Sequence, residues 1–268
     1  MSELAEMVIA SSVFCFFTGC IAGYNLKKET IMNLGRLRTV SAHSTRAIFT
    51  NRALRVPIAR SPYRCVGKGS YSNTQSMPCV CKWFRPGVDS IIESTYYERD
   101  LRAIARARDL IQEWNNLCLM SEVEVLKPEV CSLSKDQAVV TIEPYIEEFS
   151  KFNSNTGWAD SSTHTGELMQ ALSHFSYHAT DGQALICDLQ GGYELENLGE
   201  KLLLSGPVIH SSNGEYGTGD FGFIGMCDFF RHHKCNRYCK RKWRQLEVNG
   251  SYNRPQKGTK LMKNPFRN

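Results

Sequence analysis

Acidic residues are missing from a long stretch near the start of this sequence. No Asp or Glu occurs between Glu29 and Asp89, whereas arginines are frequent there. The sequence after Cys239 is also basic, and neither basic stretch has the interleaved aromatic residues of a recognisable nucleic-acid-binding module. Because the formal net charge is only +5, we interpret both stretches as solvated basic faces. No nucleic-acid partner is predicted.

Regular cysteine spacing is also lacking. The chain has 11 cysteines, an odd number, and they are scattered along its 268 residues. A secreted domain held by disulfides is shorter and has an even, regularly spaced set. The pattern therefore favours a cytoplasmic protein with reduced thiols and one metal site.

Long apolar runs are rare, and the longest one without charges covers residues 7–24 (MVIASSVFCFFTGCIAGY). Its length is at the lower limit for a membrane-spanning helix. Glu3 and Glu6 precede it, unlike the positive charge that begins a secretory signal. Lys27 and Lys28 follow it, which would leave the downstream chain in the cytosol if the run crossed a membrane. The alternatives are a buried helix or a non-native extension, so a membrane contact is predicted only through this run.

No internal repeat is evident, and with 42% hydrophobic residues the chain can bury a sizeable core. Short apolar alternations separated by Gly, Ser and Asn predict strands, whereas apolar residues at helical spacing with charges on the other face predict a helix over 94–115. Strands with one helix, then a mixed second half, predict an α+β protein of two lobes. The predicted strands cover residues 47–49, 54–58, 62–71, 77–84, 123–126, 138–142 and 184–189, and the further helices 165–177 and 224–230.

Residue types that bind zinc gather in the last third of the sequence. The segment F-F-R-H-H-K-C-N-R-Y-C contains His233, Cys235 and Cys239. Neutral imidazole and thiolate are the ligands that tetrahedral Zn²⁺ prefers. If the segment is helical, Cys235 and Cys239 lie one turn apart on the same face, and the distant His174 can supply the fourth ligand. Free cysteines without a metal are the alternative, and we predict zinc.

Between these ligands the sequence predicts a site that handles phosphate. Asp188 ends an apolar strand, and a carboxylate fixed there, with Gln190 beside it, can accept a proton or coordinate Mg²⁺. The alternative is an Asp that opens a turn. Gly217, Gly219 and Gly222 match G-x-G-x-x-G, which is a weak signal because no long βαβ unit surrounds it.

A second phosphate-binding element is predicted in the first half. Lys82 lies in the apolar strand V-C-K-W-F, behind the glycine-containing hairpin formed by Gly67 to Ser70. Gly67 and Gly69 allow a backbone to approach phosphates closely. Glu98 on the following helix can pair with Lys82, and Asp100 is a second candidate for this role. A solvated lysine behind an ordinary hairpin is the alternative.

Read together, these residues resemble the alpha-kinase family of atypical protein kinases. The N-terminal half matches loosely, through Gly69, Lys82 and the helix over 94–115, and the resemblance covers about residues 45–248. Four stretches carry the match, in the family's order: E-P-Y-I-E-E-F-S-K-F-N-S-N-T-G-W (143–158), A-L-S-H-F-S-Y (171–177), D-L-Q-G-G (188–192) and F-F-R-H-H-K-C-N-R-Y-C (229–239).

The resemblance implies a two-lobed, protein-kinase-like fold with ATP between the lobes and a structural zinc in the C-terminal lobe. It implies transfer of the ATP γ-phosphate to a Ser or Thr hydroxyl of a protein substrate. Lys82 would contact the phosphates, Glu143 would lie at the adenine hinge, and Asp188 would be the catalytic carboxylate. Gln190 would help to hold Mg²⁺ or Mn²⁺. The zinc ligands implied are His174, His233, Cys235 and Cys239.

The resemblance also assigns a role to the loop formed by residues 217–222, which would position nucleotide or peptide substrate through Gly217, Gly219, Asp220 and Gly222. The implied division of the chain is an N-terminal segment 1–44, an alpha-kinase-type domain 45–248 and a basic tail 249–268.

The sequence departs from the family at Gly206. The family has L-T-D-P after D-L-Q-G, with an Asp that helps to bind Mg²⁺, whereas this chain has Leu-Ser-Gly-Pro at 204–207. In the segment from Gly192 to Leu203, which we interpret as a linker, Glu194, Glu196 or Glu200 can substitute for that carboxylate. The alternative function is a catalytically impaired pseudokinase that serves as a zinc-stabilised binding module.

Overall fold

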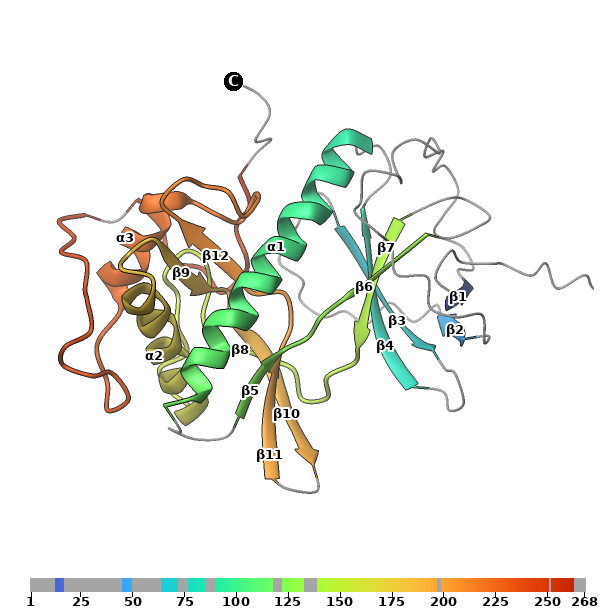
Figure 1. The fold of residues 1–268 in the computed structure, drawn as a ribbon, viewed down its shortest axis with the longest axis horizontal. Helices are drawn as coiled ribbons and strands as arrows, with labels where there is room; N and C mark the ends of the chain where they lie inside the picture. Colours follow the sequence, from blue (N-terminus) through green and yellow to red (C-terminus); the bar gives the residue numbers. More distant parts are fainter. Residues whose placement is uncertain are drawn as a thin grey trace, which may run out of the picture. The chain divides into compact units, whose positions relative to one another are not determined.

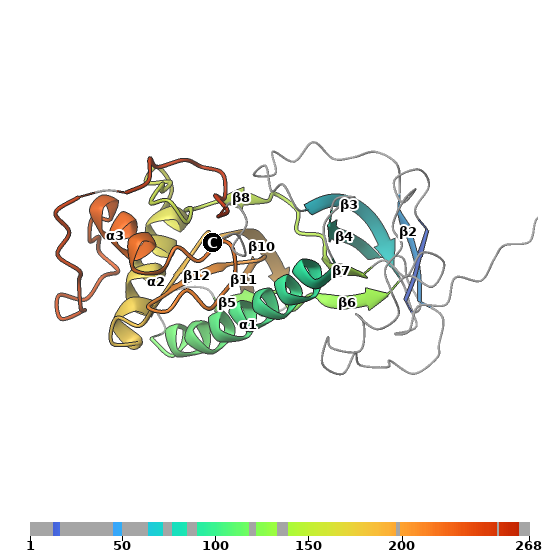
Figure 2. The same ribbon diagram turned by 90° about the horizontal axis from the view of Figure 1, so that it is seen from above.

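In the computed structural model the chain forms two compact units (Figures 1 and 2). Unit 1 comprises Met1–Pro57, Pro62–Glu98 and Lys127–Tyr145, and unit 2 comprises Ile58–Ser61, Arg99–Leu126 and Ile146–Asn268. The structure describes residues 13–16, 45–49, 64–71, 77–84, 90–117, 122–132, 139–196, 199–250 and 252–262.

Unit 1 contains a six-stranded sheet in the order β1-β2-β3-β4-β7-β6. β1 and β2 pair in parallel, and the other neighbours are antiparallel. Four strands that the sequence predicts are confirmed, with small shifts of their ends, whereas the strand predicted over 54–58 lies outside the described residues. The strands are β1 (Val13–Phe16), β2 (Thr45–Phe49), β3 (Arg64–Tyr71), β4 (Met77–Phe84), β6 (Glu129–Ser132) and β7 (Val139–Pro144).

The sequence predicts that the two glycines before Lys82 lie in a hairpin turn, but in the structure they do not. Gly67 and Gly69 lie inside β3, in register with Cys81 and Cys79 of β4. The turn prediction was wrong because the antiparallel ladder with β4 continues to Tyr71 and supplies these glycines with strand hydrogen bonds.

The apolar run 7–24 contains the strand β1, and the rest of the run lies outside the described residues. Within the part of the chain that the structure describes, no helix is both long and apolar enough to span a membrane.

The predicted helix over 94–115 is confirmed as α1 (Ser90–Asn115), which begins four residues earlier. Ile104, Leu110, Ile111 and Trp114 are buried as the helical spacing predicts, and they pack in the core of unit 2. The apolar face of this helix therefore gains its stability from packing rather than from intrinsic propensity.

Unit 2 combines two small sheets with two further helices. One sheet has the order β5-β11-β10-β8 and the other pairs β12 with β9. α2 contacts β9, and α3 contacts β12 (Figure 1). The elements are β5 (Glu122–Val125), β8 (Ser150–Lys151), α2 (His164–Ala179), β9 (Ala184–Cys187), β10 (Gln190–Glu196), β11 (Gly199–Leu204), β12 (Val208–Ser211) and α3 (Gly222–His232).

Both remaining helix predictions are confirmed, but the conditional helix over the cysteines is wrong. α3 ends at His232, because His233 has extended backbone angles (φ −69°, ψ 130°). A turn follows at Asn236, whose carbonyl and side chain accept the amides of Cys239 and Tyr238. Cys235 and Cys239 are therefore brought together by an irregular loop and not by one helical turn.

The segment from Gly192 to Leu203 is not a linker, because β10 and β11 form an antiparallel hairpin. Glu194 lies opposite Lys201, four residues beyond Gln190, or about 13 Å along the strand at roughly 3.3 Å per residue. Glu196 and Glu200 lie further toward the hairpin tip. Their positions along the hairpin do not favour a replacement of the carboxylate missing at Gly206, and such a replacement stays a prediction.

The two glycines of D-L-Q-G-G, in β10, lie where backbone atoms approach too closely to leave room for a side chain. A Cβ atom on Gly191 would lie 1.8 Å from the Leu203 carbonyl oxygen, and one on Gly192 would lie 2.5 Å from the Glu147 carbonyl oxygen. Since both obstacles are backbone atoms, Gly191→Ala is expected to lower the free energy of unfolding by about 3 kcal/mol. Urea denaturation followed by circular dichroism measures this, with Gly250→Ala, where no atom lies within 4 Å, as the control. Equal midpoints for the two variants would contradict the account.

Candidate functional site

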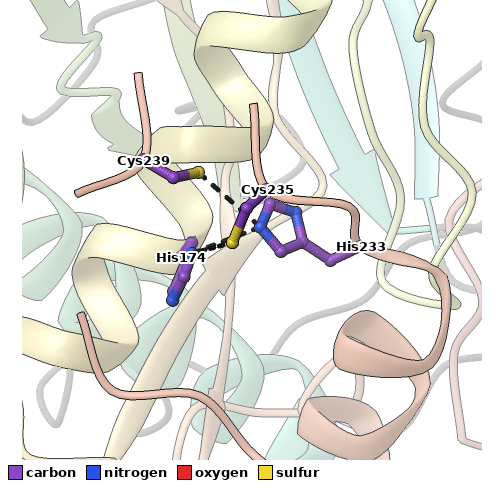
Figure 3. Close-up of side chains that lie close together, drawn as sticks. All are labelled: His174, His233, Cys235 and Cys239. Atoms are coloured by element: carbon purple, nitrogen blue, oxygen red, sulfur yellow. Dashed lines mark hydrogen bonds between the residues drawn. The ribbon is translucent and has the colours of Figure 1, made fainter. Parts of the chain in front are cut away.

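The Cys/His cluster forms as the sequence predicts. His174 comes from α2, and the other three residues come from the loop after α3. The ligand atoms of His174, His233, Cys235 and Cys239 all lie within 4.8 Å of one another. Figure 3 shows the four side chains turned toward one another.

The spacing of the ligand atoms fits a tetrahedral zinc ion. Zn–N bonds of about 2.0–2.1 Å and Zn–S bonds of about 2.3 Å place two nitrogens about 3.3 Å apart and nitrogen and sulfur about 3.6 Å apart. The distance from His233 Nε2 to His174 Nδ1 is 3.2 Å. Cys235 Sγ lies 3.6 Å from His174 Nδ1, and Cys239 Sγ lies 3.7 Å from His233 Nε2. The donor set and its size therefore suit this metal.

Neighbouring carbonyl oxygens orient both imidazoles for metal binding. His174 Nε2 donates to the Arg244 carbonyl oxygen at 2.9 Å, and His233 Nδ1 donates to Gln170 Oε1 at 3.3 Å. Each ring then carries its proton on the outer nitrogen, so the two inner nitrogens face one another as lone pairs. A cation between them relieves that repulsion, and such outer hydrogen bonds are typical of metal-binding histidines.

The surroundings of the cluster suit neutral imidazoles. Burial, and then the nearby His174, lower the pKa of His233 to about 4, and burial also lowers the pKa of His174. Burial raises the pKa of the Cys239 thiol to about 11, whereas a coordinated thiol loses its proton. Gln245 Nε2 donates to Cys235 Sγ at 3.3 Å, which stabilises negative charge on that sulfur.

A second group of polar side chains surrounds Asp188, at the end of β9. The carboxylate is almost completely buried (1% exposed), and its backbone has a positive φ of 60°. Left-handed backbone costs a residue with a side chain about 1–2 kcal/mol, and such strain is concentrated at functional sites. Asp181 and Glu148 also have positive φ angles, so burial distinguishes Asp188 from the exposed Asp181, and a functional role for Asp188 stays a prediction.

Lys151 is the partner of Asp188, and the sequence did not reveal it. Its Nζ lies 2.7 Å from Asp188 Oδ1 and 3.3 Å from Gln190 Oε1. Strand pairing explains this, because Lys151 of β8 is in register with Gln190 of β10 and so shares its face. A single lysine on a two-residue strand has no recognisable sequence pattern.

Thr259 is the other contact of Asp188 that the sequence did not reveal. Its hydroxyl donates to Asp188 Oδ2 at 2.6 Å and accepts from Lys151 Nζ at 3.1 Å. The predicted boundary of the tail at residue 249 stays a prediction, but residues 252–262 are part of unit 2 and are bonded to the rest of it through this and further hydrogen bonds.

Two asparagines fix the backbone on either side of this group. Asn153 Oδ1 accepts the amide of Leu189 at 2.8 Å, immediately after Asp188. Asn155 Nδ2 donates to the Gly219 carbonyl oxygen at 3.0 Å. The N-S-N part of the 143–158 stretch therefore joins the Asp188 turn to the glycine loop.

In the glycine loop, the carboxylate of Asp220 points inward. Its oxygens accept hydrogen bonds from the Ser211 amide and hydroxyl and from the amides of Tyr216 and Gly222. Gly217 and Gly222 have positive φ angles of 94° and 60°, which glycine adopts readily. Asp220 therefore shapes the loop, and a direct contact from its buried carboxylate (1% exposed) to a nucleotide stays a prediction.

His210 beside this loop is a buried neutral imidazole. Its Nδ1 accepts the Phe221 amide at 3.1 Å, so its proton is on Nε2, which donates to the Asn155 carbonyl oxygen at 3.1 Å. Burial lowers the pKa of His210, although Asp220, with an oxygen 4.0 Å away, opposes this. A second proton on Nδ1 would also displace the Phe221 amide.

Acidification below about pH 6.5 is expected to destabilise the protein through His210. Above the unfolded pKa of 6.5 the ring is neutral in both states, but below it only the unfolded chain takes up the proton. The free energy of unfolding then falls by up to about 1.4 kcal/mol per pH unit for this group. Urea denaturation between pH 5.5 and 7.5 tests this against His210→Gln, for which a flatter profile is expected. Parallel profiles would overturn it.

Lys82 and Glu143 form an ion pair within unit 1. Lys82 of β4 is in register with Thr141 of β7, so Glu143, two residues further, shares its face. The side chain of Glu143 is 5% exposed and that of Lys82 is 20% exposed. The pairing was not predicted, and both the adenine-hinge position of Glu143 and a pairing of Lys82 with Glu98 stay predictions.

Comparisons with known proteins identify the family of this chain. Residues 59–239 match the alpha-kinase family. The alpha-protein kinase vwkA of Dictyostelium discoideum is 35% identical over 102 residues, which are 37% of this chain and 16% of that protein. The human eukaryotic elongation factor 2 kinase is 30% identical over 158 residues, which are 57% of this chain and 20% of that protein. The chain thus matches about a fifth or less of the length of these relatives.

The alpha-kinase domain of myosin-II heavy chain kinase A, solved in complex with AMP-PNP, has a similar fold. Its TM-score is 0.60 at 21% sequence identity, and the match covers 76% of this chain and 90% of that one. The mixed content of sheets and helices therefore matches an alpha-kinase fold. Since the family match covers most of the sequence and the fold agrees with it, this chain belongs to the alpha-kinase family.

Proposed function

We propose that this protein is an ATP-dependent serine/threonine protein kinase that transfers the γ-phosphate of ATP to a hydroxyl of a protein substrate. Membership of the alpha-kinase family and the nucleotide complexes of the similar myosin heavy chain kinase domain support ATP as the donor. The observation that carries the proposal is the buried Asp188, held in a strained backbone conformation with Lys151 and Gln190 beside it.

Asp188 is the residue that accepts or orients the proton of the acceptor hydroxyl. Phosphoryl transfer needs positioning and charge neutralisation more than covalent chemistry, and a fixed carboxylate provides the first. Lys151 holds the Asp188 carboxylate in place from the neighbouring strand. Lys82, kept in position by Glu143, would contact the phosphates.

The cofactors proposed are ATP, Mg²⁺ or Mn²⁺, and Zn²⁺. Asp188 and Gln190 supply two oxygen atoms for a divalent cation, and Mg²⁺ completes such a set with water and phosphate oxygens. Zinc would bind His174, His233, Cys235 and Cys239 and tie the loop after α3 to α2. Four protein ligands leave no open position, which is typical of a structural zinc.

The test is transfer of label from γ-radiolabelled ATP to a generic basic protein. The full chain would be purified with zinc and assayed with Mg²⁺ or Mn²⁺, and the labelled residue identified by mass spectrometry. Phosphoserine or phosphothreonine supports the proposal. A folded, zinc-containing protein that transfers no label under either metal contradicts it.

A catalytically impaired pseudokinase is the second candidate, and Gly206 is the observation that favours it. Gly206 follows β11, and its neighbour Ser205 donates its amide to the Gln190 carbonyl oxygen at 3.0 Å. A carboxylate at this position would therefore begin close to Gln190, but glycine supplies none. A pseudokinase would have the same fold and the same zinc site, and its function would be to bind a partner.

Restoring the carboxylate distinguishes the two candidates. Gly206 has a positive φ of 55°, which Asp and Asn tolerate better than other side chains. For an active kinase, we expect Gly206→Asp to lower the Mg²⁺ concentration that gives half-maximal transfer about tenfold, because one further charged ligand is worth about 1.4 kcal/mol or more. Gly206→Asn controls for backbone strain and should leave the Mg²⁺ dependence unchanged. Transfer that appears only in the Asp variant identifies a pseudokinase.

A protein substrate with a Ser or Thr acceptor is the partner proposed, and nucleic acid is not. A cytoplasmic location, and any membrane contact through residues 7–24, remain predictions.

A further inference from the structure

The C-terminal segment formed by residues 252–262 places a hydroxyl group on the proposed catalytic carboxylate. Thr259 Oγ1 donates to Asp188 Oδ2 at 2.6 Å, while Lys151 Nζ contacts both Thr259 Oγ1 and Asp188 Oδ1. A hydroxyl that donates to the catalytic carboxylate has the geometry that a phosphate acceptor requires. Thr259 therefore lies where a substrate hydroxyl is expected.

The residue after this hydroxyl is held through its main chain. The Lys260 amide donates to Asn155 Oδ1 at 2.9 Å, and Asn155 Nδ2 donates to the Lys260 carbonyl oxygen at 2.7 Å. Asn155 is 1% exposed, so a buried side-chain amide satisfies both polar groups of one peptide residue. Such contacts recognise an extended backbone regardless of side chain, as in strand addition.

Further contacts continue this pattern on both sides. The Gln256 amide donates to Thr156 Oγ1 at 3.0 Å, and the Met262 amide donates to the Thr218 carbonyl oxygen at 2.8 Å. Thr156 is completely buried, and Thr218 is 4% exposed. Asn155, Thr156 and Thr218 thus bind the main chain of the segment, and we name this set of residues, together with Trp158, the acceptor groove.

Two lysine side chains of the segment lie over aromatic rings, Lys260 over Phe221 and Lys257 over Trp158. Lys257 Nζ lies 5.3 Å from the centre of the Trp158 ring, within the range of a cation–π interaction. Lys257 precedes Thr259 by two residues. The acceptor groove therefore includes a place for a cation two residues before the acceptor.

We propose that residues 252–262 occupy the groove that binds the substrate peptide, as a built-in competitor with Thr259 in the acceptor position. In the acceptor groove, Asn155 binds the main chain of the residue after the acceptor. Trp158 binds a cation two residues before the acceptor. This inference rests on the proposed kinase function. Because the segment is covalently attached, its effective concentration is high, on the order of millimolar, and external substrates must displace it.

The first test measures competition in the full chain. Thr259→Val removes the hydroxyl that bonds to Asp188 but keeps the size of the side chain. The apparent KM for a synthetic peptide with the sequence of residues 252–262 is expected to fall about tenfold, since a hydrogen bond to a charged group is lost, while kcat stays the same. Thr165→Val, at a half-buried position of α2 whose hydroxyl bonds to that of Tyr193, is the matched control and should change neither constant.

The second test does not depend on catalysis. Hydrogen exchange of the Lys260 amide, followed by mass spectrometry, is expected to accelerate when the same peptide is added at millimolar concentration. A peptide with Ala in place of Lys257 should need about threefold more to give the same acceleration, which is the usual size of an exposed cation–π contact.

The outcomes separate this inference from the kinase proposal. If a generic protein is phosphorylated but the peptide neither accelerates exchange nor is phosphorylated, the acceptor groove is refuted and the kinase function stands. If the peptide accelerates exchange but no protein or peptide is phosphorylated, the kinase function fails and the acceptor role of the groove fails with it. Unchanged KM values in Thr259→Val, at an unchanged melting temperature, also overturn the inference.

Discussion

Asp188→Asn is expected to reduce phosphate transfer from ATP by about 10³-fold while leaving the protein folded. General-base catalysis by a positioned side chain typically contributes about 10²–10⁴-fold. Asn has the same shape, tolerates the positive φ of 60° at this position, and offers an oxygen to Lys151 Nζ, which lies 2.7 Å from Asp188 Oδ1. The substitution therefore removes the charge and the proton acceptor and keeps an oxygen for Lys151, whereas the Thr259 hydroxyl loses the oxygen to which it donates.

The chain supplies a matched control for this substitution. Asp181 also has a positive φ, of 51°, but it lies in the turn after α2, where it pairs with Arg244 at the surface. Asp181→Asn tests the same chemical change in the same backbone region and should keep full activity. The rate of label transfer and the melting temperature would be measured for both variants. Equal rates for wild type and Asp188→Asn would remove Asp188 from the catalytic role.

The helices and the Cys/His cluster could be predicted because most of their signals are local. Apolar residues at helical spacing determine α1 and α2, and their ends moved by at most four residues. Closely spaced His and Cys residues form a recognisable pattern, so the clustering of His233, Cys235 and Cys239 was predicted correctly even though the helix proposed for them does not form.

The β10–β11 hairpin could not be predicted from its composition. Its outer part contains Glu194, Glu200 and Lys201, and Leu195 is 81% exposed. A strand of this kind lacks the alternation that marks a half-buried strand. Its stability depends on pairing with β5, which is distant in the sequence. We interpreted it as a linker for that reason.

The contacts around Asp188 could not be predicted from the sequence, for a related reason. Lys151 and Thr259 lie 37 and 71 residues from Asp188. A lone Lys and a lone Thr occur throughout any soluble sequence, so neither forms a pattern. Only the register of β8 with β10, and the path of residues 252–262 over unit 2, bring them to the carboxylate.

Removal of zinc is expected to destabilise unit 2 by more than about 10 °C in melting temperature. Structural zinc sites in small domains contribute roughly 10–16 kcal/mol of apparent binding free energy, and each kcal/mol shifts a domain of this size by about 2–4 °C. Without the metal, His174 Nδ1 and His233 Nε2 face one another at 3.2 Å as two lone pairs, and one of the rings is completely buried. The loop after α3 then loses its attachment to α2.

Two adjacent histidines provide the control for this prediction. His233→Ala removes a ligand and should lower the melting temperature as chelation does, with loss of bound zinc by elemental analysis. His232→Ala changes the neighbouring side chain, which is exposed and outside the cluster, and should retain one zinc per chain. Because the cluster is separate from Asp188 and Gln190, chelation is expected to abolish activity only at temperatures at which the protein unfolds. A chelated protein with an unchanged melting temperature would show that the four residues do not hold a structural metal.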